Sequence, residues 1–390
     1  MQLIHLILKN LFRHKLRTIL TVLGIAIAIL AFGMIRTVIA MWYSGIEASS
    51  PNRLIARNAI SLIFPLPIAY RNAIVAVPGV SVVSYAQWFG GIYIDEKHSQ
   101  FPQIAVDAAT WFDVAPENRI SESEKAAFLR ERNAAVVGVQ LARRFGWKIG
   151  DVVRMRSMIF SGDWDFVIRG IYTGAQKSTD ETFFFFQWRY LDEQIRRLEP
   201  WRAGNVGWYV VKIADPNRSA SISEAIDRRF KNSLAETRTE TEQSFVQGFI
   251  SMSDAILVAL RIISFVIIGV ILAVLSNTMA MTARERLSEY AVLKTLGFGA
   301  RHLVLLIAGE SLLIALIGGA AGILLIGPIV DGFGVVMTLT VGAMFPIVGV
   351  SPVTRAVSLL MALGVGLAAA IFPAWRAATL RIVEGLRRVG

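Results

Sequence analysis

The stretch RERLSEYAVLKTLGFGARHL, from Arg284 to Leu303, separates two long apolar runs and carries almost all the charge in its neighbourhood. Glu285 and Glu289 are four residues apart and therefore lie on one side of a helix, and Lys294 follows them. The GFG sequence that begins at Gly297 marks the end of that helix. Such a helix either rests on a membrane surface with snorkelling cations or docks into another protein as a rigid element.

Side chains that could perform catalysis are sparse in the rest of the chain. The sequence has no cysteine, and none of its four histidines pairs with another at metal-ligand spacing on a helix. It also lacks GxxxxGK[ST], GxSxG and HExxH, the motifs of P-loop ATPases, serine hydrolases and zinc proteases. We therefore expect a protein that is not an enzyme, with no metal site and no directly bound cofactor.

The elements that must position these charges are membrane spans. Mean hydropathy is +0.54 and 54% of the residues are hydrophobic, which is too apolar for an ordinary soluble domain. Charged residues still make up 18% of the chain, which leaves room for a sizeable soluble portion. In a membrane protein an excess of lysine and arginine marks the segments that stay in the cytoplasm. We therefore attribute the net charge of +11 to membrane topology and not to nucleic-acid binding.

Four apolar runs have the length of about 20 residues that a helix needs to cross a bilayer. They are Thr18–Ile35, which continues past Arg36, and then Ile262–Ala283, Leu303–Gly327 and Ala356–Trp375. Basic residues precede the first run, which could instead be a signal peptide. Its apolar core is longer than the usual ~7–15 residues of such peptides, so we favour a span.

Lysines and arginines cluster in three of the segments that flank these spans. The clusters are Lys9, Arg13, Lys15 and Arg17; Arg284, Arg286, Lys294 and Arg301; and Arg376, Arg381, Arg387 and Arg388. The connection between the third and fourth spans has no lysine or arginine before Arg355. Because short basic flanks stay in the cytoplasm, we expect both termini there and residues 43–251 outside.

The outer segment 43–251 alternates strand and helix patterns and predicts an α+β domain, with a lobe inserted near residues 115–202. Ser221 and Glu224 fit a capping box at the start of one helix. The run Phe183–Phe186 is either an exposed apolar surface that binds an amphiphile or a buried strand. We favour the strand, because consecutive apolar residues are typical of fully buried strands.

Three ionisable residues lie within the apolar runs. Arg36 and Arg261 are near the outer ends of the first two spans, where they snorkel, mark the point at which the spans leave the membrane, or do both. Glu310 lies about two turns into the third span, where a carboxylate is costly unless it faces a partner or water. We expect it to pair with Arg284 or with a cation of the N-terminal segment.

Gly318 and Gly322 form a small-xxx-small pair in the third span. Small residues at this spacing let two helices approach closely. The pair marks either a contact between two copies of the chain or packing within one copy.

Several stretches, taken in order, resemble the MacB/FtsX/LolCE-type permeases of ABC transporters, the type VII or mechanotransmission class. They are Asn10–Ala28, Ala135–Met155, the charged stretch after the second span, and Pro373–Arg387. The family's coupling-helix pattern E-R-x-x-E-x-x-x-x-K-x-x-G corresponds here to Glu285, Arg286, Glu289, Lys294 and Gly297. With Arg284 and Leu293, these are the ATPase-coupling residues that the resemblance implies.

The resemblance implies a membrane α-helical protein with four transmembrane helices and a large α+β extracytoplasmic domain inserted between helices 1 and 2. Its parts would be a cytoplasmic amphipathic helix (1–17), helix 1 with a stalk (18–42), a MacB-like domain (43–251), a stalk with helix 2 (252–283), a coupling helix (284–302), helix 3 (303–328), an outer loop (329–353), helix 4 (354–375) and a cytoplasmic tail (376–390).

The implied function is that of a permease subunit in a bacterial inner membrane, with no fused ATPase domain. A separate ATPase would bind ATP and Mg²⁺, and motion of the periplasmic domain would export or extract a periplasmic or membrane substrate: an amphiphile, lipid, lipoprotein, peptide or antibiotic. Two alternatives stay open. One is an FtsX-like signalling permease that controls an extracytoplasmic hydrolase or sensor without transport, and the other is LolC/LolE-like lipoprotein release.

The expected partners follow from the same resemblance. They are the ABC ATPase, a second permease copy in a homodimer or a heterodimer with a sister chain, a periplasmic adaptor or other extracytoplasmic partner, and membrane lipid. No nucleic acid is expected.

Overall fold

The computed structural model describes residues 15–95, 101–176, 179–251, 254–340 and 350–379. Within these ranges the chain divides into two compact units. The first contains the apolar helices and the second contains the segment between the first two of them. The expected amphipathic helix (1–17) and cytoplasmic tail (376–390) lie mostly outside the described residues.

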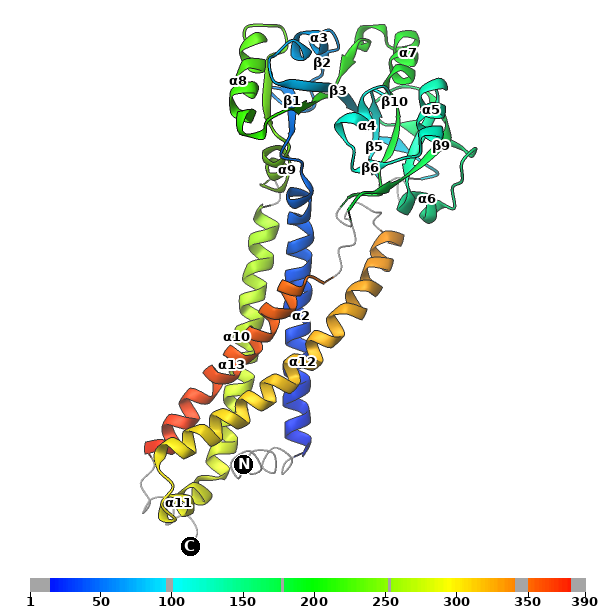
Figure 1. Ribbon diagram of the computed structural model, residues 1–390. Coiled ribbons are helices and arrows are strands. Elements are labelled where there is room, and N and C mark those ends of the chain that lie inside the picture. The colour runs from blue at the N-terminus through cyan, green and yellow to red at the C-terminus, as the bar shows by residue number, and fades with distance from the viewer. Residues whose placement is uncertain (1–14, 96–100, 177–178, 252–253, 341–349, 380–390) are drawn as a thin grey trace. The chain divides into compact units, whose positions relative to one another are not determined.

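Four long helices build the first unit: α2 (Lys15–Ala48), α10 (Asp254–Glu285), α12 (Ala300–Thr340) and α13 (Pro352–Thr379) (Figure 1). A short helix, α11 (Leu287–Thr295), connects α10 to α12. Each long helix is apolar and long enough to cross a membrane, which confirms the four spans expected from the sequence. In a bilayer a helix satisfies all its backbone hydrogen bonds internally, so apolar runs of this length fold as helices.

The four helices of this unit share one apolar core. It includes Ile25 and Ile29 of α2, Leu275 of α10, Ala315 of α12 and Ala369 of α13, all buried. Large apolar side chains on the outward faces stay exposed, among them Phe265, Leu324 and Leu360. An apolar outer surface around an apolar core is what a lipid-embedded bundle requires.

The second unit is built on a mixed sheet. Its strands run in the order β13-β1-β12-β3-β5-β10-β7-β9-β8-β4, and β6 pairs with β9. The strands are β1 (Arg53–Asn58), β3 (Val80–Trp88), β4 (Gly91–Ile92), β5 (Gln103–Val106), β6 (Asn118–Arg119), β7 (Ala134–Gly138), β8 (Val152–Ser157), β9 (Asp163–Gly174), β10 (Phe184–Gln187), β12 (Trp208–Ile213) and β13 (Thr237–Thr241). A separate pair joins β2 (Leu66–Pro67) to β11 (Asn205–Val206).

Helices accompany the strands of this unit. They are α3 (Tyr70–Val75), α4 (Trp111–Val114), α5 (Glu122–Arg130), α6 (Val139–Phe145), α7 (Trp188–Leu198), η1 (Pro200–Arg202), η2 (Pro216–Arg218), α8 (Ser219–Arg229) and α9 (Glu242–Ser251). Two apolar cores result. Phe184 and Phe186 of β10 belong to one, and Phe185 belongs to the other.

Three residues of the phenylalanine run, Phe184 to Phe186, form a buried strand, as favoured from the sequence, and Phe183 is half-buried directly before it. Strand β10 lies in the middle of the sheet, between β5 and β7. Successive side chains of a strand point to opposite faces, so a strand covered on both faces is apolar at every position.

The capping box expected at Ser221 and Glu224 is wrong. Helix α8 begins at Ser219, and the Ser221 hydroxyl donates backwards to the carbonyl oxygen of Arg218 at 2.9 Å. The capping box of this unit lies at the start of α5. There the backbone N–H of Glu124 donates to Ser121 Oγ, and the N–H of Ser121 donates to Glu124 Oε2.

Candidate functional site

The charged stretch folds as a separate short helix between two spans. Helix α10 ends at Glu285, Arg286 has non-helical backbone angles, and α11 begins at Leu287. At its far end Gly297 has a φ of 93°, and the N–H groups of Phe298 and Gly297 donate to the carbonyl oxygens of Leu293 and Lys294. This is a Schellman motif, so the predicted end of the helix at Gly297 is confirmed.

A buried ion pair fixes the start of α11 to helix α12. Arg286 Nη1 donates to Glu310 Oε2 at 3.0 Å, and the two side chains are only 4% and 8% exposed. The expectation that Glu310 pairs with Arg284 or an N-terminal cation is wrong. Arg284 is exposed, whereas Arg286 points inward. The ion pair with Arg286 lowers the free-energy cost of burying the Glu310 carboxylate within an apolar helix.

A second ion pair joins the end of α10 to α2. The Nη1 and Nη2 groups of Arg17 donate to the two carboxylate oxygens of Glu285, each at 2.7 Å. This is the bidentate geometry of a strong pair. Arg17, Arg286 and Glu310 also line a small polar cleft together with Thr21, Thr278 and Thr282. The carboxylates at 285 and 310 thus connect three spans close to the coupling segment.

Helix α11 buries one side and exposes the other. Tyr290 and Ala291 are both buried, Tyr290 packs against α12 and α13 side chains, and Leu293 packs on the same cluster. Burial, together with the negative charge of Glu310, raises the pKa of Tyr290 to about 12. Lys294 Nζ donates to the carbonyl oxygen of Ala378 in the last turn of α13 at 2.8 Å. Both ends of α11 are therefore tied to neighbouring spans.

The outer side of α11 and the turn after it carry exposed apolar side chains. Val292 is 47% exposed, Leu296 is 71% exposed and Phe298 is 38% exposed. Glu289 is half-buried. We call Val292, Leu296 and Phe298 the outer face of α11. The sequence-based prediction missed Val292, whose i, i+4 spacing from Leu296 could have indicated this surface, and the expected Leu293 packs inward.

The small-xxx-small pair packs within one chain. A Cβ atom at Gly318 would lie 2.8 Å from the Cβ of Ile25, and one at Gly322 would lie 2.6 Å from the backbone oxygen of Ala26. Both contacts are with α2. These glycines let α12 approach α2 closely, which is the second of the two roles left open above.

The arginines expected at the outer boundary lie on uninterrupted helix. Arg36 and Arg261 are both exposed. Helix α2 continues past Arg36 to Ala48, and α10 begins at Asp254, before Arg261. Helices that continue beyond their terminal cations are compatible with a stalk.

In the second unit, a buried arginine at the start of β1 joins three separate segments. Arg53, whose side chain is 7% exposed, pairs with Glu117 at 2.7 Å and Glu242 at 2.9 Å. It also donates to the carbonyl oxygen of Val114. Glu242 opens helix α9 and accepts a bond from the N–H of Ser50. We call Arg53, Glu117 and Glu242 the basal clamp; no local pattern in the sequence indicates it.

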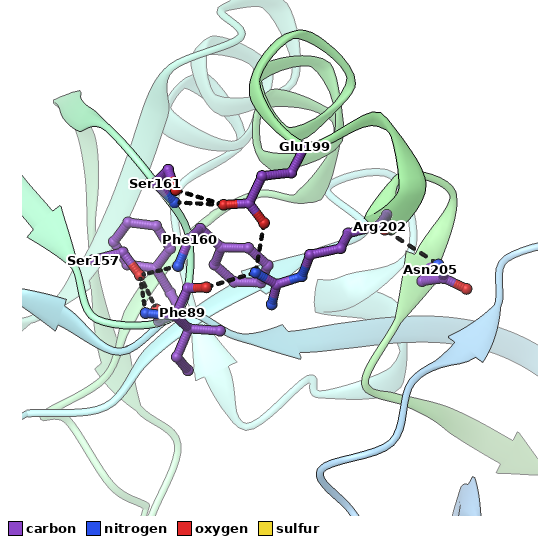
Figure 2. A network of polar contacts seen from close by, with 8 residues as sticks. Phe89, Ser157, Phe160, Ser161, Glu199, Arg202 and Asn205 are labelled. Atoms are coloured by element: carbon purple, nitrogen blue, oxygen red, sulfur yellow. Dashed lines mark hydrogen bonds and ion pairs between the residues drawn. The ribbon is translucent and has the colours of Figure 1, made fainter.

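A second polar network of this unit fixes the loop between β8 and β9 to the end of α7 (Figure 2). Glu199 accepts bonds from the N–H and hydroxyl of Ser161 and from Arg202 Nη1, the shortest at 2.6 Å. The bonds from Ser161, followed by that from Arg202, hold the pKa of Glu199 at about 2. The Arg202 guanidinium also stacks 4.6 Å above the ring of Phe160.

The two segments that this network joins carry exposed apolar side chains. Met158 is 72% exposed and Ile159 is 37% exposed on the loop, while Leu198 is 50% exposed and Trp201 is 76% exposed beside η1. Arg202 bonds the carbonyl oxygen of Ile159, so the two segments are in direct contact. We call these four residues the Trp201 patch.

Comparison with known proteins accounts for nearly all of the chain. The MacB-like periplasmic core domain matches residues 18–229, and the FtsX-like permease C-terminal region matches residues 261–382. The chain belongs to the MacB/FtsX family of ABC transporter permeases. The first match lies on α2 and the second unit, and the second match covers α10 to α13.

Two relatives of the permease are themselves described as uncharacterized ABC transporter permeases. One, from Methanocaldococcus jannaschii, is 23% identical over 97% of this chain and 96% of its own. The other, from Mycobacterium tuberculosis, is 25% identical over 68% of this chain, which corresponds to 30% of that longer relative. Among solved structures, the periplasmic region of MacB from Actinobacillus actinomycetemcomitans aligns with 52% of this chain and 95% of its own, at 11% identity and a TM-score of 0.39.

The permease is thus a multi-pass membrane protein with a large domain between its first two spans. Within the described ranges, no group of His, Cys, Asp and Glu side chains could hold a metal ion. The candidate site consists of α11, its two ties to α12 and α13, and the pair Arg17–Glu285.

Proposed function

We propose that the permease converts ATP hydrolysis by a separate ATPase subunit into motion of its extracytoplasmic domain. The observation that carries the proposal is the anchoring of α11 at both ends. Arg286 ties its start to Glu310 of α12, and Lys294 ties its end to Ala378 of α13. A helix held in this way moves its two spans when it is pushed, because packed helices shift as rigid elements.

The outer face of α11 is the proposed contact with the ATPase. Val292, Leu296 and Phe298 are exposed where the segment turns between two spans. Apolar anchors at the centre of an interface supply most of its binding energy. Glu289 and Lys294 flank this face and would contribute charge complementarity. ATP and Mg²⁺ would bind to the ATPase, and the permease would act as one half of a pair of like or sister chains.

This proposal includes an orientation in the cytoplasmic membrane. The α11 end of the bundle would face the cytoplasm, because the short basic flanks of the spans lie at that end. The domain between α2 and α10 would then be extracytoplasmic. The basal clamp would receive the motion of the spans, since Arg53 follows α2 and Glu242 opens the helix that precedes α10.

We further propose that the motion exports or extracts a periplasmic or membrane substrate. The Trp201 patch is the candidate contact with an extracytoplasmic partner, such as an adaptor. It combines exposed apolar side chains with a rigid polar support, as hot spots of interfaces do. Signalling control of an extracytoplasmic hydrolase and release of lipoproteins would use the same motion on different partners.

The experiment that tests the proposal is purification of the full chain from its native membrane in a mild detergent, with and without crosslinking. Recovery of an ABC ATPase with an adaptor or an outer component supports export. Recovery of the ATPase with a cell-wall hydrolase or a sensor supports signalling. If no ATPase is recovered under either condition, the coupling role of α11 is overturned.

A photo-crosslinking residue at Trp201 refines this experiment. The same residue placed at Arg228, which is exposed on α8, is the matched control. Crosslinks that form at 201 and not at 228 locate the partner on the Trp201 patch. Equal crosslinking at both positions contradicts that assignment.

A further inference from the structure

A groove between α10, α11 and α13 lies beside the coupling segment and is not used by the proposed ATPase contact. Its floor is apolar and includes Ala280, Leu287, Phe372 and Pro373. Two arginines, Arg284 and Arg376, line the same groove. The groove thus pairs an apolar floor with two positive charges.

Both arginines are exposed and lie at the ends of helices. Arg284 is in the last turn of α10, and Arg376 is in the last turn of α13. Across the described ranges, no carboxylate forms an ion pair with either of them. The neighbouring carboxylate of Glu285 is bound to Arg17 instead. Two like charges on one groove repel each other, and an anion placed between them would remove that repulsion.

Aromatic side chains on the same part of α13 indicate what kind of anion would fit. Trp375 is 63% exposed, Phe372 is 54% exposed, and their ring centroids are 6.4 Å apart. Tryptophan is enriched where a span meets the headgroup layer of a bilayer. Exposed apolar rings directly before a basic residue at the end of a span place the groove at the boundary between acyl chains and headgroups.

We propose that this groove binds an anionic phospholipid. Its phosphate would lie between the guanidinium groups of Arg284 and Arg376, and an acyl chain would lie along Phe372 and Leu287. Guanidinium groups bind phosphate through paired hydrogen bonds, and basic pockets between spans at the cytoplasmic side are sites for acidic headgroups. The lipid would link α10 to α13 next to α11. The proposal rests on the orientation given under the proposed function, which places this end in the anionic leaflet.

The test uses the full-length permease in nanodiscs of phosphatidylcholine alone or with phosphatidylglycerol. Native mass spectrometry of protein released from the discs counts retained lipids. Wild-type protein should retain phosphatidylglycerol in preference to phosphatidylcholine. Arg284→Gln combined with Arg376→Gln should lower that retention by about tenfold or more. Arg284→Lys combined with Arg376→Lys should keep part of it, because the charge remains.

The matched control is Arg301→Gln. Arg301 is an exposed arginine at the same end of the bundle, in the first turn of α12, and it does not line the groove. It should retain phosphatidylglycerol as the wild-type protein does. Equal retention by the wild-type protein and the double glutamine variant overturns the proposal, and so does an equal loss in the Arg301→Gln control.

Association with the ATPase is measured separately on the same variants. If the double glutamine variant loses the ATPase and keeps the lipid, the two arginines serve the ATPase and the lipid site is overturned. The lipid measurement contains no ATPase, so it stands even if the coupling role of α11 fails.

Discussion

Arg286 Nη1 lies 3.0 Å from Glu310 Oε2, and this pair connects the start of α11 to the interior of α12. Both side chains are buried, at 4% and 8% exposed, so little water reaches either partner. A charge left alone in such a place is costly, whereas an intact pair roughly offsets its own desolvation. The pair therefore acts as a rigid link, and its contribution to net stability is secondary.

Removing one member of this pair should destabilise the permease strongly. Arg286→Met leaves the Glu310 carboxylate buried without a partner and should cost about 3–5 kcal/mol of unfolding free energy. The double variant Arg286→Met with Glu310→Met should recover most of that loss, because no buried charge remains. Thermal unfolding in detergent measures both effects.

The work that each variant obtains from ATP hydrolysis should not follow its stability. Glu310→Gln should leave expression intact, because glutamine can still accept a hydrogen bond from Arg286. The unpaired Arg286 charge should lower the melting temperature and the work obtained per ATP hydrolysed. The double methionine variant should also be uncoupled although it is stable. Wild-type coupling in that double variant would show that the pair is only structural.

Gly322 should tolerate no side chain. Gly322→Ala places a Cβ atom 2.6 Å from the backbone oxygen of Ala26, so α2 and α12 must separate and the melting temperature should fall. Gly327→Ala is the matched control on the same helix, because a Cβ atom there meets nothing within 4 Å. That change should be neutral or stabilising by about 0.5–1 kcal/mol. Similar melting temperatures of the two variants would exclude close packing at Gly322.

The outer face of α11 should control recruitment of the ATPase. Leu296→Glu places a charge on the proposed apolar contact and should weaken binding by about tenfold or more. Glu289→Lys should weaken it as well by reversing a flanking charge. Binding is measured by co-purification over a range of ATPase concentrations. Leu234→Glu, a fully exposed position in the second unit, is the control and should bind normally.

The Glu199 network should lose stability in acid. The pKa of Glu199 is about 2, below its ordinary value of 4.5, so its stabilisation is complete above pH 4.5 and is lost as the pH falls towards 2. Glu199→Gln should remove this dependence and cost about 2 kcal/mol at neutral pH. Melting temperatures across pH 2–5 measure the effect. Glu224→Gln, from an exposed pair with Arg228, should show no change in the acid profile.

The basal clamp should be another point of strong sensitivity. Arg53→Met leaves Glu117 and Glu242, which are 32% and 19% exposed, without their buried cation and should cost about 1.5–3 kcal/mol. Arg228→Met breaks an exposed i, i+4 pair instead and should cost less than about 1 kcal/mol. Thermal unfolding of both variants in detergent measures the difference, and equal effects would contradict a special role for Arg53.

The sequence determined those features that depend on neighbours along the chain. Apolar length predicts the four spans, because a bilayer accepts uninterrupted helices of that length. Gly297 ends α11, because a glycine adopts positive φ at low cost. The alternation of Phe184, Phe185 and Phe186 between two cores follows from the pleat of a strand.

Tertiary structure decided which distant groups meet. Arg284 and Arg286 are two positions apart, which is about 200° around a helix, so only one of them can face the interior. The sequence offered Arg284 as the partner of Glu310, but packing of α11 against α12 and α13 turns Arg286 inward. Ser221 and Ser121 fit the same capping pattern, and only Ser121 sits at the start of a helix. Pairings of this kind depend on how helices and strands pack, and no local pattern encodes that.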